Sequence, residues 1–421
     1  MPELPEVEHY RRILLPLVGG GPIALHCPPP LPTKRFPSRH VVDLINVGKY
    51  DIKKVLRKGK VLCIILTRDV IEKLDDDGPV VERSGDDDDD AIMTISGKEP
   101  TIYLSLHMGM TGRISSPDRG VPKLESLSGD ESYPPSHTHL ILRATKNGTE
   151  AAFSDPRRFG SVLVDAPGKG KGMEEENDDD DGQDEHLWEE DRIPTFRDIA
   201  PDALEASGSA RRRRFIEVGG TMTEISTIVE GLMNRKKGIK GLLLDQRAVV
   251  SGVGNWVADE LLYRCRIHPD QTYLNMTEAC ALVDELHHIL SMAVTCLDAN
   301  VDFPDDWLFH RRWRNGFGGN LMAKDVHGRS IKFIQSGGRS SAIVPSIQKK
   351  LARSSAHRAK KEKGTIRKVN LKDADQNQKV TPTTSSSASN KLGKKRKVNE
   401  EGATLKPTQP TRMSRRLRIS H

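Results

Sequence analysis

The second residue of the chain could act as an amine nucleophile. Methionine is usually removed before a small residue, and loss of Met1 would leave Pro2 with a free secondary amine. A terminal α-amine has a pKa of about 7.7–8.0, against ~10.4 for a lysine, so a useful fraction is unprotonated at neutral pH. When such an amine attacks a sugar C1′ it forms a cationic iminium, an electron sink that acidifies the C2′ proton and permits elimination.

Glu3 follows directly and is placed to move protons in such a reaction. For two residues taken alone, the default interpretation is that Pro2 and Glu3 merely begin a helix. Pro5 suits a first helical turn, and apolar side chains over residues 2–18 fall on one helical face. We therefore expect a short extended start and then a helix.

Length and composition predict more than one domain. The chain has 421 residues, of which 36% are hydrophobic and only 5% aromatic, with a mean hydropathy of −0.54. Domains of roughly 100–200 residues predict two or three, with part of the chain unpacked. No apolar run reaches the ~20 residues that cross a bilayer, so no membrane partner is expected. The acidic start does not resemble a secretory signal.

The net charge of +6 is unevenly distributed. Residues 349–421 carry +16, whereas residues 69–90 and 166–192 carry −9 each, which leaves +8 for the remainder. The acidic runs predict disordered insertions, and the basic remainder suits a protein that neutralises phosphates. The charge balance alone is a weak indication of that function.

Cysteine usage favours a reducing location inside the cell. No two of the five cysteines form a C-x-x-C pair, so neither a disulfide framework nor a cysteine zinc site is expected. The five are Cys27, Cys63, Cys265, Cys280 and Cys296.

The pattern of apolar residues changes after residue 198. Before it, β-branched runs predict strands at residues 41–45, 61–66, 101–106, 140–143 and 161–164. After it, helices are predicted at residues 222–233, 241–245, 256–266 and 276–297, and a β-hairpin at residues 331–344. Residues beyond Lys349 are rich in Ser, Thr and Lys and predict a disordered tail.

Several short motifs, taken in order along the chain, resemble the formamidopyrimidine-DNA glycosylase (Fpg, MutM) family. Each motif alone is weak, and their shared order over residues 2 to about 348 carries the resemblance. The motifs are Pro2-Glu3-Leu4-Pro5-Glu6-Val7-Glu8 with Arg11-Arg12, Arg57-Lys58-Gly59-Lys60, His107-Met108-Gly109-Met110-Thr111-Gly112, Asp155-Pro156-Arg157-Arg158-Phe159-Gly160, Ile199-Ala200-Pro201, Gly252-Val253-Gly254-Asn255, Ala258-Asp259-Glu260 and Ile267-His268-Pro269.

The resemblance implies an α+β multidomain fold with four parts. An N-terminal catalytic β-sandwich with helices would span residues 2–198 and contain both acidic insertions. A helix–two-turn–helix DNA-binding domain would span 199–302, a zincless β-hairpin finger 303–348, and a disordered basic tail 349–421. Bacterial members carry four cysteines on the finger, whereas this chain has none after Cys296. Residues 336–345 instead resemble the zincless finger of plant and fungal members, which implies a hairpin held by packing, with Phe333 and Ile343 as candidates.

The resemblance also implies roles for ten residues. Pro2, Glu3 and Lys60 would be catalytic, and His107, Lys240, Asn255 and Arg339 would contact DNA phosphates. Met110, Arg157 and Phe159 would fill the void left by an extruded nucleotide. Taken singly, a lysine is more often a solvated surface residue, a histidine a satisfied one and a methionine or phenylalanine part of a core. Met110 is expected in a turn, which favours exposure.

The glycine motif and the tail carry two further expectations. Gly252 and Gly254 allow a tight turn whose N–H groups could face a phosphate, with Asn255 at the N-cap of the next helix. Lys394-Lys395-Arg396-Lys397-Val398 resembles a nuclear localisation signal, so a nuclear protein is expected. A nonspecific basic tail that adds DNA affinity is an equal and compatible alternative.

Together, the resemblance implies a bifunctional DNA glycosylase/AP lyase that removes oxidised or ring-opened purines. It would act as a monomer on damaged double-stranded DNA, with no diffusible cofactor and no zinc. The endonuclease VIII branch, which prefers oxidised pyrimidines, is less favoured because Leu4 replaces glycine in the Pro-Glu-Gly-Pro start of that branch. A catalytically silent DNA-binding protein on the same scaffold is the alternative from another class.

Overall fold

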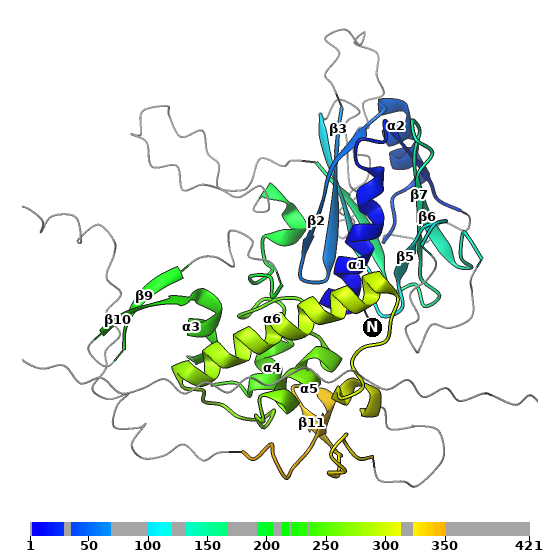
Figure 1. Ribbon diagram of the computed structural model, residues 1–421. Coiled ribbons are helices and arrows are strands. Elements are labelled where there is room, and N and C mark those ends of the chain that lie inside the picture. The colour runs from blue at the N-terminus through cyan, green and yellow to red at the C-terminus, as the bar shows by residue number, and fades with distance from the viewer. Residues whose placement is uncertain are drawn as a thin grey trace, which may run out of the picture. The chain divides into compact units, whose positions relative to one another are not determined.

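Two antiparallel four-stranded sheets form the first half of the chain (Figure 1). The computed structural model describes residues 2–28, 35–68, 100–119, 132–166, 192–204, 213–218, 221–233, 236–312 and 323–350. One sheet has the order β1-β6-β7-β5, with β1 (Ile23–His26), β5 (Arg113–Ser115), β6 (Thr138–Ala144) and β7 (Glu150–Ser154). The other has the order β2-β3-β4-β8, with β2 (Asp51–Lys58), β3 (Val61–Thr67), β4 (Thr101–His107) and β8 (Ser161–Asp165).

Strand β3 shows why the sheets pack face to face. Leu62, Ile64 and Leu66 point into a core that both sheets share. On the opposite face, Cys63 and Ile65 pack with Phe196 of the short helix η3 (Pro194–Phe196). Because both faces of the strand are covered, its sequence is apolar throughout rather than alternating. This arrangement confirms the expected N-terminal sandwich.

The strand expected at residues 41–45 is wrong, since these residues belong to helix α2 (Arg39–Gly48). The β-branched side chains suggested a strand, but Ser38 caps the helix by accepting a hydrogen bond from the Val41 N–H at 3.3 Å. Val41, Val42 and Ile45 are the buried residues, a spacing that one helical face presents to a core.

Helix α1 (Leu4–Leu14) takes part in both large cores of the described chain. Val7 and Tyr10 belong to the sandwich core, whereas Leu4 belongs to a second core built by the later helices. The helix packs against β2, β5 and α6 (Met276–Ala299), and Figure 1 shows it between the strands and the long α6. The residues that precede α1 are thereby placed where the two cores meet.

The later part is mainly helical. It contains α3 (Thr227–Met233), α4 (Ile239–Leu243), α5 (Asn255–Arg264) and α6, with a two-stranded sheet of β9 (Arg213–Val218) and β10 (Thr221–Ser226) before them. The helices expected at 256–266 and 276–297 are confirmed. The helix expected at 222–233 is wrong in its first half, where β10 pairs with β9.

By length and composition, α6 could cross a membrane. Its buried residues, among them Leu282, Leu286 and Ile289, instead pack within the second core of the described chain. Its apolar character is therefore that of a core helix. Asn275 caps its first turn by accepting from the Glu278 N–H at 2.9 Å.

The described chain ends with a hairpin of β11 (Lys332–Ser336) and β12 (Arg339–Ile343). Gly337 and Gly338 form its two-residue turn and both have positive φ, 59° and 74°. All described residues belong to one compact unit, Met1–Lys368. The bulk of each predicted acidic insertion, the nuclear signal and the tail beyond residue 350 lie outside the described residues.

Candidate active site at the amino terminus

Glu3 is buried between α1 and the start of α5. Its two carboxylate oxygens accept hydrogen bonds from the backbone N–H groups of Trp256 and Val257, at 2.9 and 3.1 Å. These groups belong to the first turn of α5, where N–H donors lack partners within the helix and attract negative charge. The residue next to Pro2 therefore closes the N-terminus of a helix some 250 positions away in the sequence.

The glycine turn before α5 makes room for this contact. Gly252 has a φ of +96°, and its carbonyl accepts from the Leu4 N–H at 3.1 Å. A Cβ on Gly254 would lie 2.1 Å from Cδ of Glu3, so no larger residue fits there. Three N–H groups in and just after this turn are bound within the chain, and the expectation that the turn faces a phosphate stays a prediction. The Gly252 N–H is bound by Gln246, and the N–H groups of residues 256 and 257 are bound by Glu3.

A second carboxyl group, that of Glu6, lies beside Glu3. Its Oε2 accepts from the Glu3 N–H at 3.0 Å, and its Oε1 accepts from the indole N–H of Trp256 at 3.1 Å. Burial, together with the negative charge of Glu3, raises the pKa of Glu6 to about 7. Burial also raises the pKa of Glu3, although Lys60 and the α5 N–H groups oppose the rise. Close to the amino terminus the chain thus places two buried carboxyl groups whose pKa values are both raised by burial.

Lys60 provides the cation of the site. It follows Gly59 in the tight turn from β2 to β3, where Gly59 has a φ of +58°. Desolvation lowers the pKa of Lys60, while the negative charges of Glu3 and Glu6 act in the opposite direction. Two of the three catalytic candidates, Glu3 and Lys60, are therefore brought into one electrostatic neighbourhood, and Glu6 joins them. Pro2, the third, precedes Glu3 directly in the chain.

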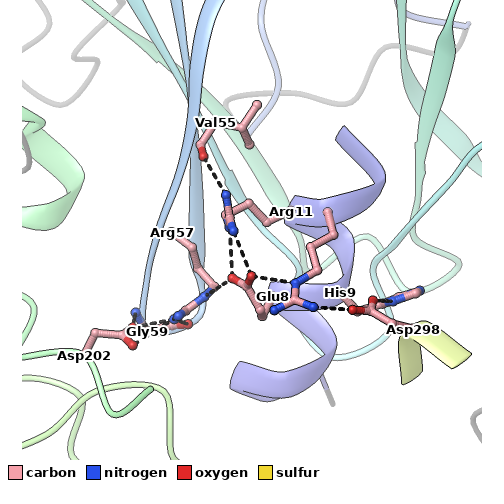
Figure 2. A network of polar contacts seen from close by, with 9 residues as sticks. Glu8, His9, Arg11, Val55, Arg57, Gly59, Asp202 and Asp298 are labelled. Atoms are coloured by element: carbon pink, nitrogen blue, oxygen red, sulfur yellow. Dashed lines mark hydrogen bonds and ion pairs between the residues drawn. The ribbon is translucent and has the colours of Figure 1, made fainter. Parts of the chain in front are cut away.

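A buried ionic network holds this turn against α1, and Figure 2 shows it. The Arg57 guanidinium donates to Glu8 Oε2 at 3.0 Å and pairs in bidentate fashion with Asp202. Asp202 also accepts from the Gly59 N–H at 2.6 Å. Arg57 has no exposed side-chain surface, so these contacts replace water completely.

The other end of the network reaches α6 (Figure 2). Asp298 accepts from His9 Nδ1 at 2.7 Å and pairs with Arg12, and Arg12 also pairs with Glu8. Sequence reasoning assigned no role to Glu8, Arg57 or Asp202. The first two lie within quoted motifs, but no pattern along the chain indicated that Arg57 pairs with Asp202, 145 positions away.

The three residues expected to fill a void come together on the surface. Met110 lies in a turn and is 38% exposed, and Phe159 is 45% exposed. The Arg157 guanidinium lies 4.9 Å from the Phe159 ring centroid, a cation–π distance. Asp155 holds the loop by accepting from the N–H groups of Arg157 and Gly160. The turn that carries Met110 lies against this loop, since a Cβ on Gly109 would meet the backbone of Phe159 and Gly160. Core packing does not explain apolar side chains exposed on two adjoining loops, which favours a role in binding.

The phosphate contacts expected from the sequence divide into two groups. His107 and Arg339 are exposed, at the end of β4 and the start of β12. Lys240 is completely buried, and its ammonium group donates to Asp259 and Ser341, at 2.5 Å each. A phosphate therefore cannot reach Lys240 in this structure, and its observed role is to anchor the hairpin.

Asn255 and Asp259 complete that anchor. Asn255 is the first residue of α5 rather than its N-cap, which is Gly254, and its amide donates to the Ser340 carbonyl at 3.1 Å. Asp259 Oδ2 accepts from Arg312 at 2.9 Å and from the Ala342 N–H at 3.1 Å. Polar contacts to α5 therefore supplement the packing that the sequence led us to expect.

Packing under the hairpin also differs in part from the expectation. Phe333 packs against a small core of Tyr263, Leu308, Ile331, Ala342 and Val344, whereas Ile343 is buried outside that core. All five cysteines are free. Within the described ranges, no three His, Cys, Asp or Glu side chains converge as ligands for a metal ion.

Two domain models of one DNA glycosylase match the chain. The N-terminal domain model of formamidopyrimidine-DNA glycosylase matches residues 1–162, and the H2TH domain model of the same enzyme matches residues 220–304. The chain therefore belongs to the formamidopyrimidine-DNA glycosylase family.

Individual relatives agree with this assignment. A formamidopyrimidine-DNA glycosylase of Arabidopsis thaliana is 30% identical over 277 residues, which are 65% of this chain and 60% of that protein. The chain thus spans less than two thirds of this relative's length.

Solved structures share the fold. Fpg of Lactococcus lactis bound to DNA with an AP site matches 83% of this chain and 100% of that chain, with a TM-score of 0.51 and 18% identity. MutM in complex with DNA that contains carbocyclic 8-oxo-G matches over the same shares, with a TM-score of 0.51 and 20% identity.

Proposed function

We propose that this protein is a DNA glycosylase with AP lyase activity that removes oxidised or ring-opened purines from double-stranded DNA. One observation carries the proposal: Glu3, the residue bonded to Pro2, is buried beside Glu6 and interacts electrostatically with Lys60, where the two cores meet. Amine, proton carrier and cation are the groups that imine chemistry on a sugar requires. Family membership supports the choice of substrate, and so do the structures of Fpg and MutM, which share the fold and are bound to DNA with an AP site or carbocyclic 8-oxo-G.

The reaction begins with the Pro2 amine, once Met1 has been removed. Its nitrogen lone pair forms a bond to C1′ as the C1′–base bond breaks, and the departing base takes the bonding electrons and a proton. Opening of the sugar then gives an iminium at C1′. A protonated carboxyl can supply a proton here, and the raised pKa values of Glu3 and Glu6 suit that task.

Strand cleavage follows from the iminium. Loss of a C2′ proton to a carboxylate places electrons between C1′ and C2′, and the 3′-phosphate leaves by β-elimination. A second elimination releases the 5′-phosphate, and water then frees the Pro2 amine. Lys60 is suited to neutralise charge on a phosphate of this nucleotide, because its turn is held firmly by Asp202.

DNA binding would use the exposed groups. Arg339 and His107 are suited to phosphate contacts, and Met110, Arg157 and Phe159 to the space that an extruded nucleotide leaves. 8-Oxoguanine, formamidopyrimidines and hydantoins are the candidate lesions. The basic tail would add affinity and direct the protein to the nucleus through residues 394–398.

Borohydride trapping tests the proposal. Borohydride reduces an iminium to a stable amine, so the wild-type protein should form a covalent adduct with a duplex that contains 8-oxoguanine opposite cytosine. Pro2→Gly should lose most of the adduct, because a primary amine in a shifted position replaces the secondary one. Pro16→Gly, at an exposed proline in η1 (Leu15–Leu17), is the matched control and should retain it. Absence of an adduct from the wild type, or undiminished trapping by Pro2→Gly, would contradict the proposal.

Removing the tail tests its two roles. A protein that ends at Gln348 should still cleave DNA at the lesion but should bind DNA more weakly. Its salt slope, the slope of the logarithm of the DNA-binding constant against the logarithm of salt concentration, should also be smaller. The same truncation should abolish nuclear accumulation of a fluorescent fusion. An unchanged slope would show that the tail does not contact DNA, and unchanged accumulation would show that it carries no nuclear signal.

A further inference from the structure

Trp256 contacts both carboxyl groups of the site. Its backbone N–H donates to Glu3 at 2.9 Å, and its indole N–H donates to Glu6 at 3.1 Å. Any residue at position 256 except proline would provide the first contact, whereas the second needs a ring that carries a donor at this distance. Only the indole contact therefore depends on the identity of this side chain.

An aromatic cluster fixes the indole in place. The Trp256 ring lies 5.3 Å from the ring of Phe303, 6.2 Å from that of Trp307 and 5.2 Å from that of Phe309, between centroids. Trp256 is 4% exposed, so its N–H has no ready access to water. A buried indole usually finds one hydrogen-bond acceptor, and here that acceptor is a carboxyl group of the site.

Glu6 is therefore oriented from two sides. The indole binds Oε1, and Oε2 accepts from the Glu3 N–H at 3.0 Å. The Glu3 N–H belongs to the peptide bond that joins Pro2 to Glu3. Through Glu6, the indole thus restrains the peptide unit that carries the proposed nucleophile.

We propose that Trp256 is a positioning residue, whose indole N–H orients Glu6 and so sets how the Glu3–Glu6 pair shares a proton beside the Pro2 amine. This inference rests on the proposed function. The indole does not touch substrate and acts only through Glu6. A donor to one carboxylate oxygen favours the charged form of that group, so loss of the donor makes Glu6 hold its proton to higher pH.

Other charged groups also act on this pair. Glu6 faces Glu3, Lys60, Tyr10 and the amino terminus. Glu3 in addition faces Arg312 and Lys240. None of these groups is changed when Trp256 is replaced by phenylalanine, so a change in the pH profile of that variant reports the indole contact.

The test compares Trp256→Phe with Trp307→Phe. Both replace a buried tryptophan of the same aromatic cluster, but of these two indoles it is that of Trp256 that donates to Glu6. Single-turnover borohydride trapping is measured from pH 5 to 9 on a duplex with 8-oxoguanine opposite cytosine. On the acid side of the plot of trapping rate against pH, the midpoint for Trp256→Phe should move up by about one pH unit. This is the size expected for one lost hydrogen bond to a charged group. The midpoint for Trp307→Phe should equal that of the wild type.

Glu6→Gln provides a second and independent measurement. It keeps an amide oxygen for the indole but removes the titrating group, so its midpoint on the acid side should move to lower pH even if Trp256→Phe does not fold. In the Glu6→Gln background, Trp256→Phe should no longer shift the midpoint. Equal midpoints for Trp256→Phe and wild type, an equal shift in Trp307→Phe, or a shift that persists without Glu6 would each overturn the inference. Failure of the wild type to form any adduct would instead overturn the proposed function.

Discussion

Replacing Gly254 by alanine should remove Glu3 from the N-terminus of α5. The added Cβ would lie 2.1 Å from Glu3 Cδ and 2.4 Å from its Oε1, so the Glu3 side chain would have to move away from α5. Gly254 has a φ of −119°, which alanine adopts freely, so backbone strain does not contribute. The displaced carboxylate would lose both of its N–H donors, at residues 256 and 257.

The size of the effect follows from these contacts. A hydrogen bond to a charged group contributes about 1.5–3 kcal/mol, and a displaced carboxylate recovers part of that from other partners. We therefore expect the free energy of unfolding to fall by about 3 kcal/mol. The trapping rate should fall by about 100-fold or more, because positioned proton carriers contribute factors of that size.

Gly238→Ala is the matched control. Gly238 is the N-cap of α4 and has a φ of −56°, and a Cβ there would come no closer than 3.3 Å to its neighbours. Its substitution should change the unfolding free energy by about 1 kcal/mol or less, with trapping intact. Urea unfolding and single-turnover trapping would be measured for both variants. If Gly254→Ala traps DNA as fast as Gly238→Ala, the role assigned to Glu3 is refuted.

Three further changes probe the rest of the account. Arg57→Ala should lower the unfolding free energy by about 3–5 kcal/mol in urea, because it removes the buried cation that pairs with both Glu8 and Asp202. A change within about 0.5 kcal/mol, as at an ordinary surface position, would refute this. Lys240→Met should leave the salt slope of DNA binding unchanged, because Lys240 is buried. Arg339→Gln should reduce that slope by the amount that about one phosphate contact contributes. The reverse result would restore Lys240 as a DNA contact. Since burial raises the pKa of Glu6 from 4.5 to about 7, the folded state retains a proton that the unfolded state loses in that window. Stability should therefore fall as the pH rises from 4.5 to 7, and an equal fall in Glu6→Gln would exclude Glu6 as its source.

Hydrophobic patterns in the sequence correctly predicted the helices and strands that are apolar along their whole length. The long helix α6 and the strand β3 follow their patterns closely, because each is apolar along its length and packs within a core. Residues 41–45 were predicted wrongly because β-branched residues suit both a strand and a buried helical face. The deciding contact is the Ser38 cap, which composition alone does not indicate.

The site was predicted in its residue types but not in its pairings. Motif order placed Pro2, Glu3 and Lys60 together, and the structure brings Glu3 and Lys60 into one electrostatic neighbourhood. The sequence could not show that Lys240 is covered by the hairpin, since its partner Ser341 lies 101 positions away. Long-range partners of this kind depend on tertiary packing, which a local pattern does not record.

The central claim is that the Pro2 nitrogen forms the covalent bond to deoxyribose. Mass spectrometry of the borohydride-trapped complex, digested with a protease, tests it most directly. The account predicts that the DNA remnant lies on the peptide that begins at Pro2, with Met1 absent and the mass added at the proline nitrogen. An adduct on a lysine such as Lys60, or lesion cleavage by a protein whose amino terminus remains blocked, would contradict it.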